Sequence, residues 1–184
     1  DTVGDIETLR SVFRACAGRR VQLLYVAGPA GAEGAADAAG RTGKGIIARA
    51  ANDLCRYYAA REGVQTKILR VPFLYTASAA LEDPFLAPLF DACLTGSVAL
   101  QGAQDAAFPL LCAEELAVLV RRIFDSWDGN FETLDVADTF HHASGEVGEA
   151  LKALFRGLSV AYGDSAGYAL PVSDVVRVRY GWFQ

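Results

Sequence analysis

A glycine-rich segment, Gly40 to Gly45 (GRTGKG), is the stretch whose residue types and spacing come nearest to a ligand-binding loop. It precedes an expected helix, so Arg41 and Lys44 would stand beside backbone N–H groups that can hold an anion. The segment departs from the phosphate-loop pattern. Ala38 replaces the first glycine, and Gly45 replaces the hydroxyl that binds the metal. Anion binding is therefore an alternative to an ordinary surface loop.

The two histidines, His141 and His142, are adjacent and follow Asp138. Together they could suggest a metal site. Side chains of neighbouring residues diverge, however, and one short stretch rarely supplies three ligands to one ion. We therefore predict no metal site here.

Composition narrows the class of protein. The 184 residues are 52% hydrophobic and 21% charged, which is typical of a globular domain and not of a disordered chain. No apolar run approaches the roughly 18 residues that a membrane span needs. The net charge is −5, so binding to nucleic acid is disfavoured. We expect one domain over residues 1–184, with no nucleic-acid or membrane partner.

The cysteines at positions 16, 55, 93 and 112 are widely spaced and form no CxxC pair. A disulfide framework and a zinc knuckle are therefore not expected, and reduced thiols favour a cytoplasmic location. The chain begins with Asp1 and contains no methionine. We expect it to be a fragment of a longer polypeptide.

The elements that would position functional side chains alternate in the first half. Apolar spacing predicts a helix from Asp5, its N-cap, to Gly18, and short apolar runs predict buried strands. The expected order is helix 5–18, strand 21–26, loop 28–45, helix 46–61 and strand 64–69. Such alternation indicates a parallel sheet with crossover helices.

The second half is less regular. The expected elements are helix 84–94, extended residues 98–100, helix 113–127, strand 131–136, a helix from Ser144 to Arg156, extended residues 158–162 and a helix over 171–179. Ser144 would cap its helix, and Phe124 and Leu154 would face the core. The predicted fold class is α/β, a Rossmann-like, mostly parallel sheet flanked by helices.

The order of segments resembles the extended short-chain dehydrogenase/reductase superfamily, the NAD-dependent epimerase/dehydratase family. The strand at 23–26, the helix ending at 51–59 and the segment Arg70-Val71-Pro72-Phe73-Leu74-Tyr75 are similar to family segments in the same order. The closing Arg179-Tyr180-Gly181-Trp182 resembles a family ending. The resemblance implies the later part of an epimerase-type fold, without the glycine-rich N-terminal half that binds the dinucleotide.

The family's catalytic residues are not matched. A Tyr-x-x-x-Lys motif places a phenol and an ammonium on one helix face, where the lysine lowers the tyrosine pKa and holds the ribose. By the resemblance, Lys44 stands at the tyrosine position and Ala48 at the lysine position. Ala27, Gly28 and Pro29 stand where the family has a hydroxyl. We therefore predict no catalytic residues and no cofactor for this chain, and NAD(P) if the N-terminal half is present.

A vestigial pocket would lie at the carboxyl end of the strand at 64–69, because open α/β sheets bind ligands there. Pro72 and Phe73 would line it, with Ala27, Lys44 and Arg70 as neighbours.

The interpretation favours a degenerate, non-catalytic epimerase/dehydratase-like module with a structural, sensing or interaction role in a larger protein. One alternative is a fragment of a working NAD(P)-dependent nucleotide-sugar epimerase, dehydratase or reductase. A second is a small anion- or nucleotide-binding module. The rest of the polypeptide, or a partner domain, would cover the missing half of the sheet. The resemblance also implies a homodimer through two helices, with Val12, Phe13, Ile46 and Tyr57 at the interface.

Overall fold

A computed structural model gives the fold and describes six stretches of the chain: residues 2–28, 43–76, 86–108, 110–136, 142–167 and 174–182. The chain divides into two compact units. Unit 1 comprises Asp1–Val71, Val120–Val136 and Ser173–Trp182, and unit 2 comprises Pro72–Leu119, Ala137–Val172 and Phe183–Gln184. That the chain is one family domain, and a fragment of a longer one, stays a prediction.

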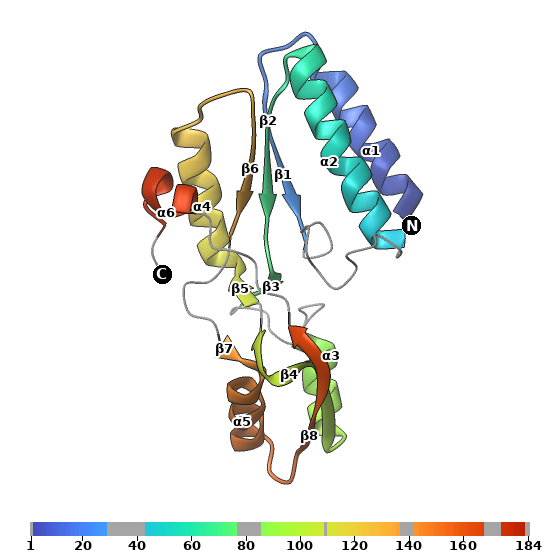
Figure 1. The fold of residues 1–184 in the computed structure, drawn as a ribbon, viewed down its shortest axis with the longest axis vertical. Helices are drawn as coiled ribbons and strands as arrows, with labels where there is room; N and C mark the ends of the chain where they lie inside the picture. Colours follow the sequence, from blue (N-terminus) through green and yellow to red (C-terminus); the bar gives the residue numbers. More distant parts are fainter. Residues whose placement is uncertain are drawn as a thin grey trace. The chain divides into compact units, whose positions relative to one another are not determined.

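Unit 1 is built on a parallel sheet with strand order β1-β2-β6, and helices pack beside it (Figure 1). Its elements are α1 (Thr2–Cys16), β1 (Gln22–Ala27), α2 (Gly43–Glu62), β2 (Gln65–Arg70), β6 (Phe131–Asp135) and α6 (Asp174–Tyr180). The helix–strand alternation predicted this arrangement, because parallel neighbours need long crossover connections. The predicted α/β class, with mostly parallel strands, is confirmed.

An aromatic pair joins α1 to α2. The rings of Phe13 and Tyr58 stack with their centroids 4.8 Å apart and their planes 11° from parallel. Both side chains are buried in a cluster that also contains Cys55 and Ile68 of β2. The spacing of apolar residues in the two helices predicted this face, because residues three and four apart share one side of a helix.

The predicted ends of these helices are partly right. Gly18 and Gly63 follow α1 and α2 with φ of 69° and 66°, a left-handed conformation that glycine adopts without strain. The start of α1 differs from the prediction. The helix begins at Thr2, so Asp5 lies inside it and is not its N-cap.

Unit 2 contains two smaller sheets. Its elements are β3 (Phe73–Tyr75), α3 (Leu86–Leu94), β4 (Ser97–Phe108), β5 (Leu110–Cys112), β7 (His142–Ala143), α5 (Ser144–Leu154) and β8 (Ser159–Gly167). β3 pairs with β5 in parallel, and the second sheet has the order β7-β4-β8. β4 and β8 extend far beyond the residues predicted as extended. Beyond Leu100 and Tyr162 the two strands are rich in Gly, Ala and polar residues and lack the apolar alternation that indicates a strand.

Helix α4 (Ala113–Asp125) begins in unit 2 and ends in unit 1. Leu119 and Ile123 of this helix are buried, as predicted, but Phe124 is 41% exposed, which contradicts the prediction. Phe124 instead stacks against Trp127, with 5.3 Å between ring centroids. An aromatic pair at a surface shields part of each ring, so neither ring needs a place in the core.

The predictions for α5 need two corrections. Leu154 is 72% exposed in the last turn of the helix, whereas Leu151 is buried. Ser144 is the first helical residue and not the cap, because its hydroxyl donates a hydrogen bond to the carbonyl of Ala106 at 3.2 Å. Ala143 is the N-cap residue, and its backbone N–H donates to the carboxylate of Glu146. The Ser144 hydroxyl therefore bonds to a residue outside the helix and does not cap the helix itself.

Within the described ranges, no helix has both the length and the apolar character required to cross a membrane.

Candidate functional site

The carboxyl ends of β1, β2 and β6 lie side by side and form the edge at which open α/β sheets bind ligands. Ala27, Arg70 and Asp135 are partners in the parallel register at the ends of these strands. The Val71 N–H donates to the Ala27 carbonyl at 2.9 Å, and the Val136 N–H donates to the Arg70 carbonyl at 2.9 Å. The backbone therefore holds this edge, which we call the carboxyl edge, in a fixed register.

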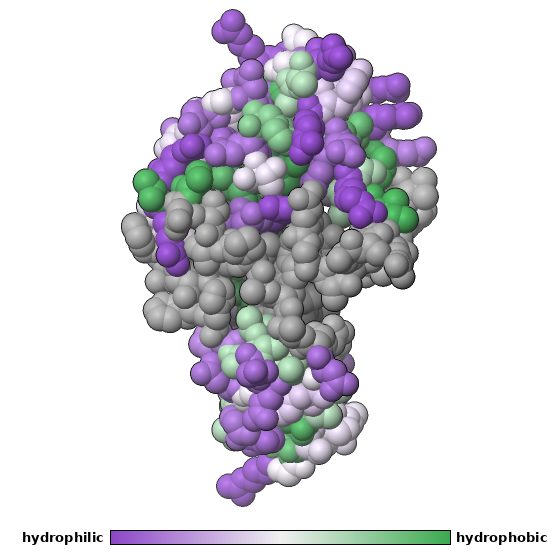
Figure 2. All heavy atoms as spheres, in the orientation of Figure 1, coloured by the Kyte–Doolittle hydropathy of each residue, from purple (hydrophilic) through white to green (hydrophobic). Residues whose placement is uncertain are grey.

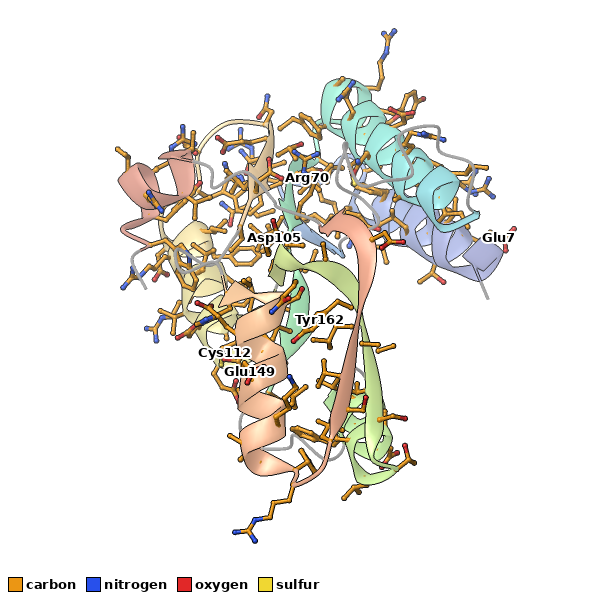
Figure 3. All side chains as sticks on the ribbon, turned by 60° about the horizontal axis from the view of Figure 1, so that its bottom comes forward. Glu7, Arg70, Asp105, Cys112, Glu149 and Tyr162 are labelled. Carbon is orange, nitrogen blue, oxygen red and sulfur yellow. The ribbon has the colours of Figure 1, made fainter. Side chains whose placement is uncertain are left out.

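Arg70 makes a two-point ion pair with Asp135 at the carboxyl edge. Its Nε and Nη2 atoms each lie 2.6 Å from one carboxylate oxygen of Asp135. The side chains are 17% and 15% exposed, so water screens the pair only partly. A bidentate pair of this kind is among the stronger ionic contacts in proteins. An anionic ligand would have to displace Asp135 to gain the charge of Arg70 (labelled in Figure 3).

Helix α2 carries the positions that the resemblance equates with the acid–base pair. The helix is continuous from Gly43 to Glu62, and Ala48 lies in its second turn. A methyl group at this position can neither bind a ribose hydroxyl nor lower the pKa of a neighbouring phenol. Lys44 lies in the first turn, but its side chain is outside the described residues, as is Pro29.

The other two predicted pocket residues belong to unit 2. Pro72 is buried, and Phe73 opens β3, where it is the register partner of Leu110. The Phe73 side chain lies outside the described residues. The structure thus brings Ala27 and Arg70 together at the carboxyl edge of unit 1. That these residues bind a cofactor stays a prediction.

Two groups of side chains in the structure have no counterpart in the sequence-based prediction. The first lies around Lys67, whose side chain is 1% exposed. Its ammonium donates to Glu132 at 2.6 Å and to Asp128 at 3.1 Å, and it lies 5.3 Å from the centroid of the Trp127 ring. Arg179 of α6 pairs with the same two carboxylates, at 2.8 Å and 3.3 Å.

The charges around Lys67 affect its pKa in two ways. Burial by itself would lower the pKa of Lys67, but the hydrogen bonds to Glu132 and Asp128 outweigh it and raise this pKa above the usual value. Lys67 and Glu132 are register partners in β2 and β6. A lysine in the middle of a predicted buried strand is a sequence signal for such a pair, although its partner is 65 residues away.

The second group lies at the carboxyl ends of β3 and β5 in unit 2. The Cys112 thiol donates to one carboxylate oxygen of Glu114 at 2.9 Å, and the Thr76 hydroxyl donates to the other at 2.8 Å. Burial and the neighbouring Glu114 carboxylate raise the pKa of Cys112, so this thiol is a hydrogen-bond donor rather than a nucleophile.

A shallow acidic hollow also lies in unit 2, lined by Gln104, Asp105, Ala143, Gly145, Glu146 and Glu149. Lys152 pairs with Glu149 at 2.7 Å, and His142 lies 3.5 Å from Glu146. His141 and Asp138 are outside the described residues. Within the part of the chain that the structure describes, no three His, Cys, Asp or Glu side chains are arranged to hold a metal ion.

No protein-family model and no curated protein matches this chain. Solved structures do match it. One is DesIV, a dTDP-glucose 4,6-dehydratase from Streptomyces venezuelae with NAD bound, at a TM-score of 0.75 and 12% identity. Others are MoeE5 in complex with UDP-glucuronic acid and NAD (0.70, 18%) and the UDP-N-acetylglucosamine 4-epimerase from Bacillus cereus (0.71, 13%).

These alignments cover 100%, 95% and 97% of this chain but 62%, 63% and 64% of the three matched chains. The chain thus spans somewhat under two thirds of their length. At such low identity the likeness concerns the fold. The fold is that of NAD-dependent epimerases and dehydratases, in agreement with the resemblance drawn from the sequence.

Proposed function

We propose that this chain is a non-catalytic module with an epimerase/dehydratase fold, which has a structural, sensing or interaction role in a larger protein. The observation that supports this most strongly is Ala48, which stands inside an uninterrupted helix α2 where the resemblance calls for a lysine. A hydride-transfer enzyme of this kind uses that ammonium to lower the pKa of its tyrosine and to hold the ribose.

The ion pair at the carboxyl edge supports the same proposal. Arg70 is the described cation nearest in sequence to the predicted pocket, and Asp135 already neutralises it in a two-point pair. Binding of a dinucleotide pyrophosphate at this arginine would leave Asp135 without its partner and next to an anion. Like charges in a partly buried site repel strongly, so the edge is not adapted to an anionic cofactor.

The alternative is a fragment of a working NAD(P)-dependent nucleotide-sugar enzyme. The agreement of fold with DesIV and the 4-epimerase over nearly the whole chain supports it, because these enzymes are longer than this chain. In that case NAD(P) would be held largely by residues outside the present sequence. The second alternative, an anion-binding loop at 40–45, falls mostly outside the described residues.

Titration of the full-length polypeptide with NADH and NADPH, followed by nicotinamide fluorescence, separates the first two proposals. The non-catalytic proposal expects no saturation up to millimolar cofactor. Saturable binding in the micromolar range would refute the loss of the cofactor site. The same titration is repeated with the variant Ala48→Lys. If this substitution raises dinucleotide affinity or turnover of a nucleotide sugar, position 48 corresponds to the lysine of the Tyr-x-x-x-Lys motif. If wild-type protein turns over such a sugar, the chain belongs to an enzyme.

We also propose that another part of the polypeptide, or a partner domain, packs against β1, and that the protein is cytoplasmic. Among the described strands, β1 pairs with β2 alone, and Val26 on it is 42% exposed. A strand with an open edge and an exposed apolar side chain favours pairing with a further strand. Limited proteolysis of the full-length protein, compared with the isolated 184-residue chain, tests this. Protection of β1 must be greater in the full-length protein.

A homodimer through α1 and α2 is a further proposal. Val12, Ile46 and Tyr57 are exposed by 43%, 53% and 54%, as interface residues of a free chain should be. Phe13 must be removed from the proposed interface, because it is fully buried against Tyr58. Light scattering after gel filtration should give a dimer mass for wild type and a monomer mass for Tyr57→Glu. A monomeric wild type would refute the proposal.

A further inference from the structure

Four arginines mark the end of unit 1 opposite the carboxyl edge. Arg14 lies in the last turn of α1, Arg61 lies in the last turn of α2, and Arg19 and Arg20 lie in the turn that leads into β1. All four are exposed, and none of them takes part in an ion pair with another described residue. Figure 2 shows many hydrophilic side chains over the end of unit 1 at which α1 and α2 finish.

The backbone brings these arginines together. Phe13 and Tyr58 stack at 4.8 Å, so the last turns of α1 and α2, which carry Arg14 and Arg61, lie side by side. The first residues of β1 and β2, Gln22 and Gln65, are register partners, and neighbouring strands run about 4.8 Å apart. The turns that precede the two strands are therefore adjacent.

The turn with Arg19 and Arg20 has a defined backbone. The Arg19 N–H donates to the Cys16 carbonyl at 3.0 Å, and the Val21 N–H donates to the Arg19 carbonyl at 3.0 Å. These bonds fix where both arginine side chains begin, next to the end of α1. We call the four residues Arg14, Arg19, Arg20 and Arg61 the arginine end.

The helix dipoles explain the presence of arginine at only two of these four positions. Cations in the last turns of α1 and α2 balance the negative ends of the helix dipoles, which accounts for Arg14 and Arg61. Arg19 and Arg20 lie beyond the helix and gain little from it. Glu62 follows Arg61 in the sequence, and the carboxylates around the start of β6, Asp128 and Glu132, already pair with Lys67 and Arg179. The four arginines therefore give this surface a positive charge, although the whole chain carries −5. Among the described residues these four cations have no ionic partner, and like charges on one surface repel one another unless an anion binds.

We propose that the arginine end is a docking surface for an acidic protein segment rich in Asp and Glu. The guanidinium group binds carboxylates in a two-point geometry, as Arg70 and Asp135 do within this molecule. A long polyanion such as RNA, or an anionic membrane, would also face the acidic remainder of a chain of net charge −5. A short acidic segment needs only the local positive charge. This inference goes beyond the proposed function, because it does not depend on whether the carboxyl edge binds a cofactor.

The test uses a fluorescein-labelled peptide of ten glutamates and the full-length polypeptide, with fluorescence anisotropy as the measure of binding. Wild type should bind saturably at 50 mM NaCl and at least tenfold more weakly at 300 mM, because salt screens surface charges. The double variant Arg19→Glu/Arg20→Glu should bind at least tenfold more weakly than wild type at 50 mM. Arg156→Glu is the matched control, since Arg156 is an exposed arginine of unit 2, and it should bind like wild type.

Three results would overturn the proposal: no saturable binding by wild type, an equal loss of binding in Arg156→Glu, or tighter binding of single-stranded RNA or phosphatidylserine vesicles than of the peptide. Thermal melting of each variant checks the fold. A second double variant, Arg14→Ala/Arg61→Ala, removes charge without reversing it, and it should weaken peptide binding less than the reversal does. NADH titration of the same variants tests the proposed function separately.

Discussion

Substitutions at the Lys67 pair should cost very different amounts, depending on which charge they remove. Lys67 is buried, whereas its partners Glu132 and Asp128 are 23% and 56% exposed. Glu132→Gln removes the carboxylate 2.6 Å from the ammonium and leaves a buried cation with one ionic partner in the solvent-facing Asp128. Hydrogen bonds to charged groups contribute about 1.5–3 kcal/mol, so we expect a loss of about 2–3 kcal/mol in the free energy of unfolding.

Lys67→Met should cost no more than about 1 kcal/mol. The methionine side chain is apolar and of similar length, and the two carboxylates remain paired with Arg179. Exchange of a buried ion pair for an apolar side chain of similar size is often close to neutral. The double variant Lys67→Met/Glu132→Gln should therefore resemble Lys67→Met, because no buried cation remains to be destabilised.

Urea unfolding and thermal unfolding, each followed by circular dichroism, measure the stability of all three variants. For a chain of this size, each kcal/mol shifts the melting temperature by roughly 2–4 °C, so Glu132→Gln should melt about 5–10 °C below wild type. The reasoning fails if Lys67→Met costs as much as Glu132→Gln, or if the double variant is as unstable as the sum of the two single variants.

Further predictions concern packing and protonation. Gly148→Ala places a methyl group against the Tyr162 hydroxyl and should lower stability by about 1–3 kcal/mol in a thermal melt, with part of the loss restored by Tyr162→Phe. Phe13→Ala should lower the free energy of unfolding by about 3–5 kcal/mol because the ring is fully buried, whereas Phe124→Ala should lower it by about 1 kcal/mol or less. Equal losses in urea unfolding would contradict the assignment of one ring as buried and the other as exposed. Burial raises the pKa of Cys55 from 9.0 to about 12, so the unfolded chain loses this proton first and stability should fall as pH rises from 9 toward 12. Cys55→Ala should flatten that part of the pH–stability curve, and an unchanged slope would argue against the assignment.

Local pattern was enough to predict most of unit 1. The stripe through Phe13, the glycines at 18 and 63, and the apolar runs that form β1 and β2 each depend on neighbours within a few residues. Periodicity and left-handed glycine conformations are properties of the chain itself. The α/β class and the parallel sheet followed from the alternating order of helices and strands, because only a few chain topologies connect such elements in one sheet.

The errors came from positions where a distant contact competed with a local preference. Ser144 has the side chain of a helix cap but donates to Ala106, 38 residues earlier in the chain. Phe124 and Leu154 occupy apolar positions of their helices, yet the packing of neighbouring elements leaves both exposed. The long strands β4 and β8 carry small side chains with little alternation. Their pairing with each other, and not their own pattern, makes them strands.

The candidate site shows the same division. The sequence by itself placed Arg70 at the end of a strand and Ala48 inside a helix, because both statements depend on short-range order. The tertiary structure alone decided that Asp135 neutralises Arg70 and that Glu132 and Asp128 hold the buried Lys67. The carboxylates of Asp135 and Glu132 are each 65 residues from their cation. Only the parallel register of β2 and β6 brings each carboxylate to 2.6 Å from its cation. A local sequence pattern does not show which residues 65 positions apart come into contact.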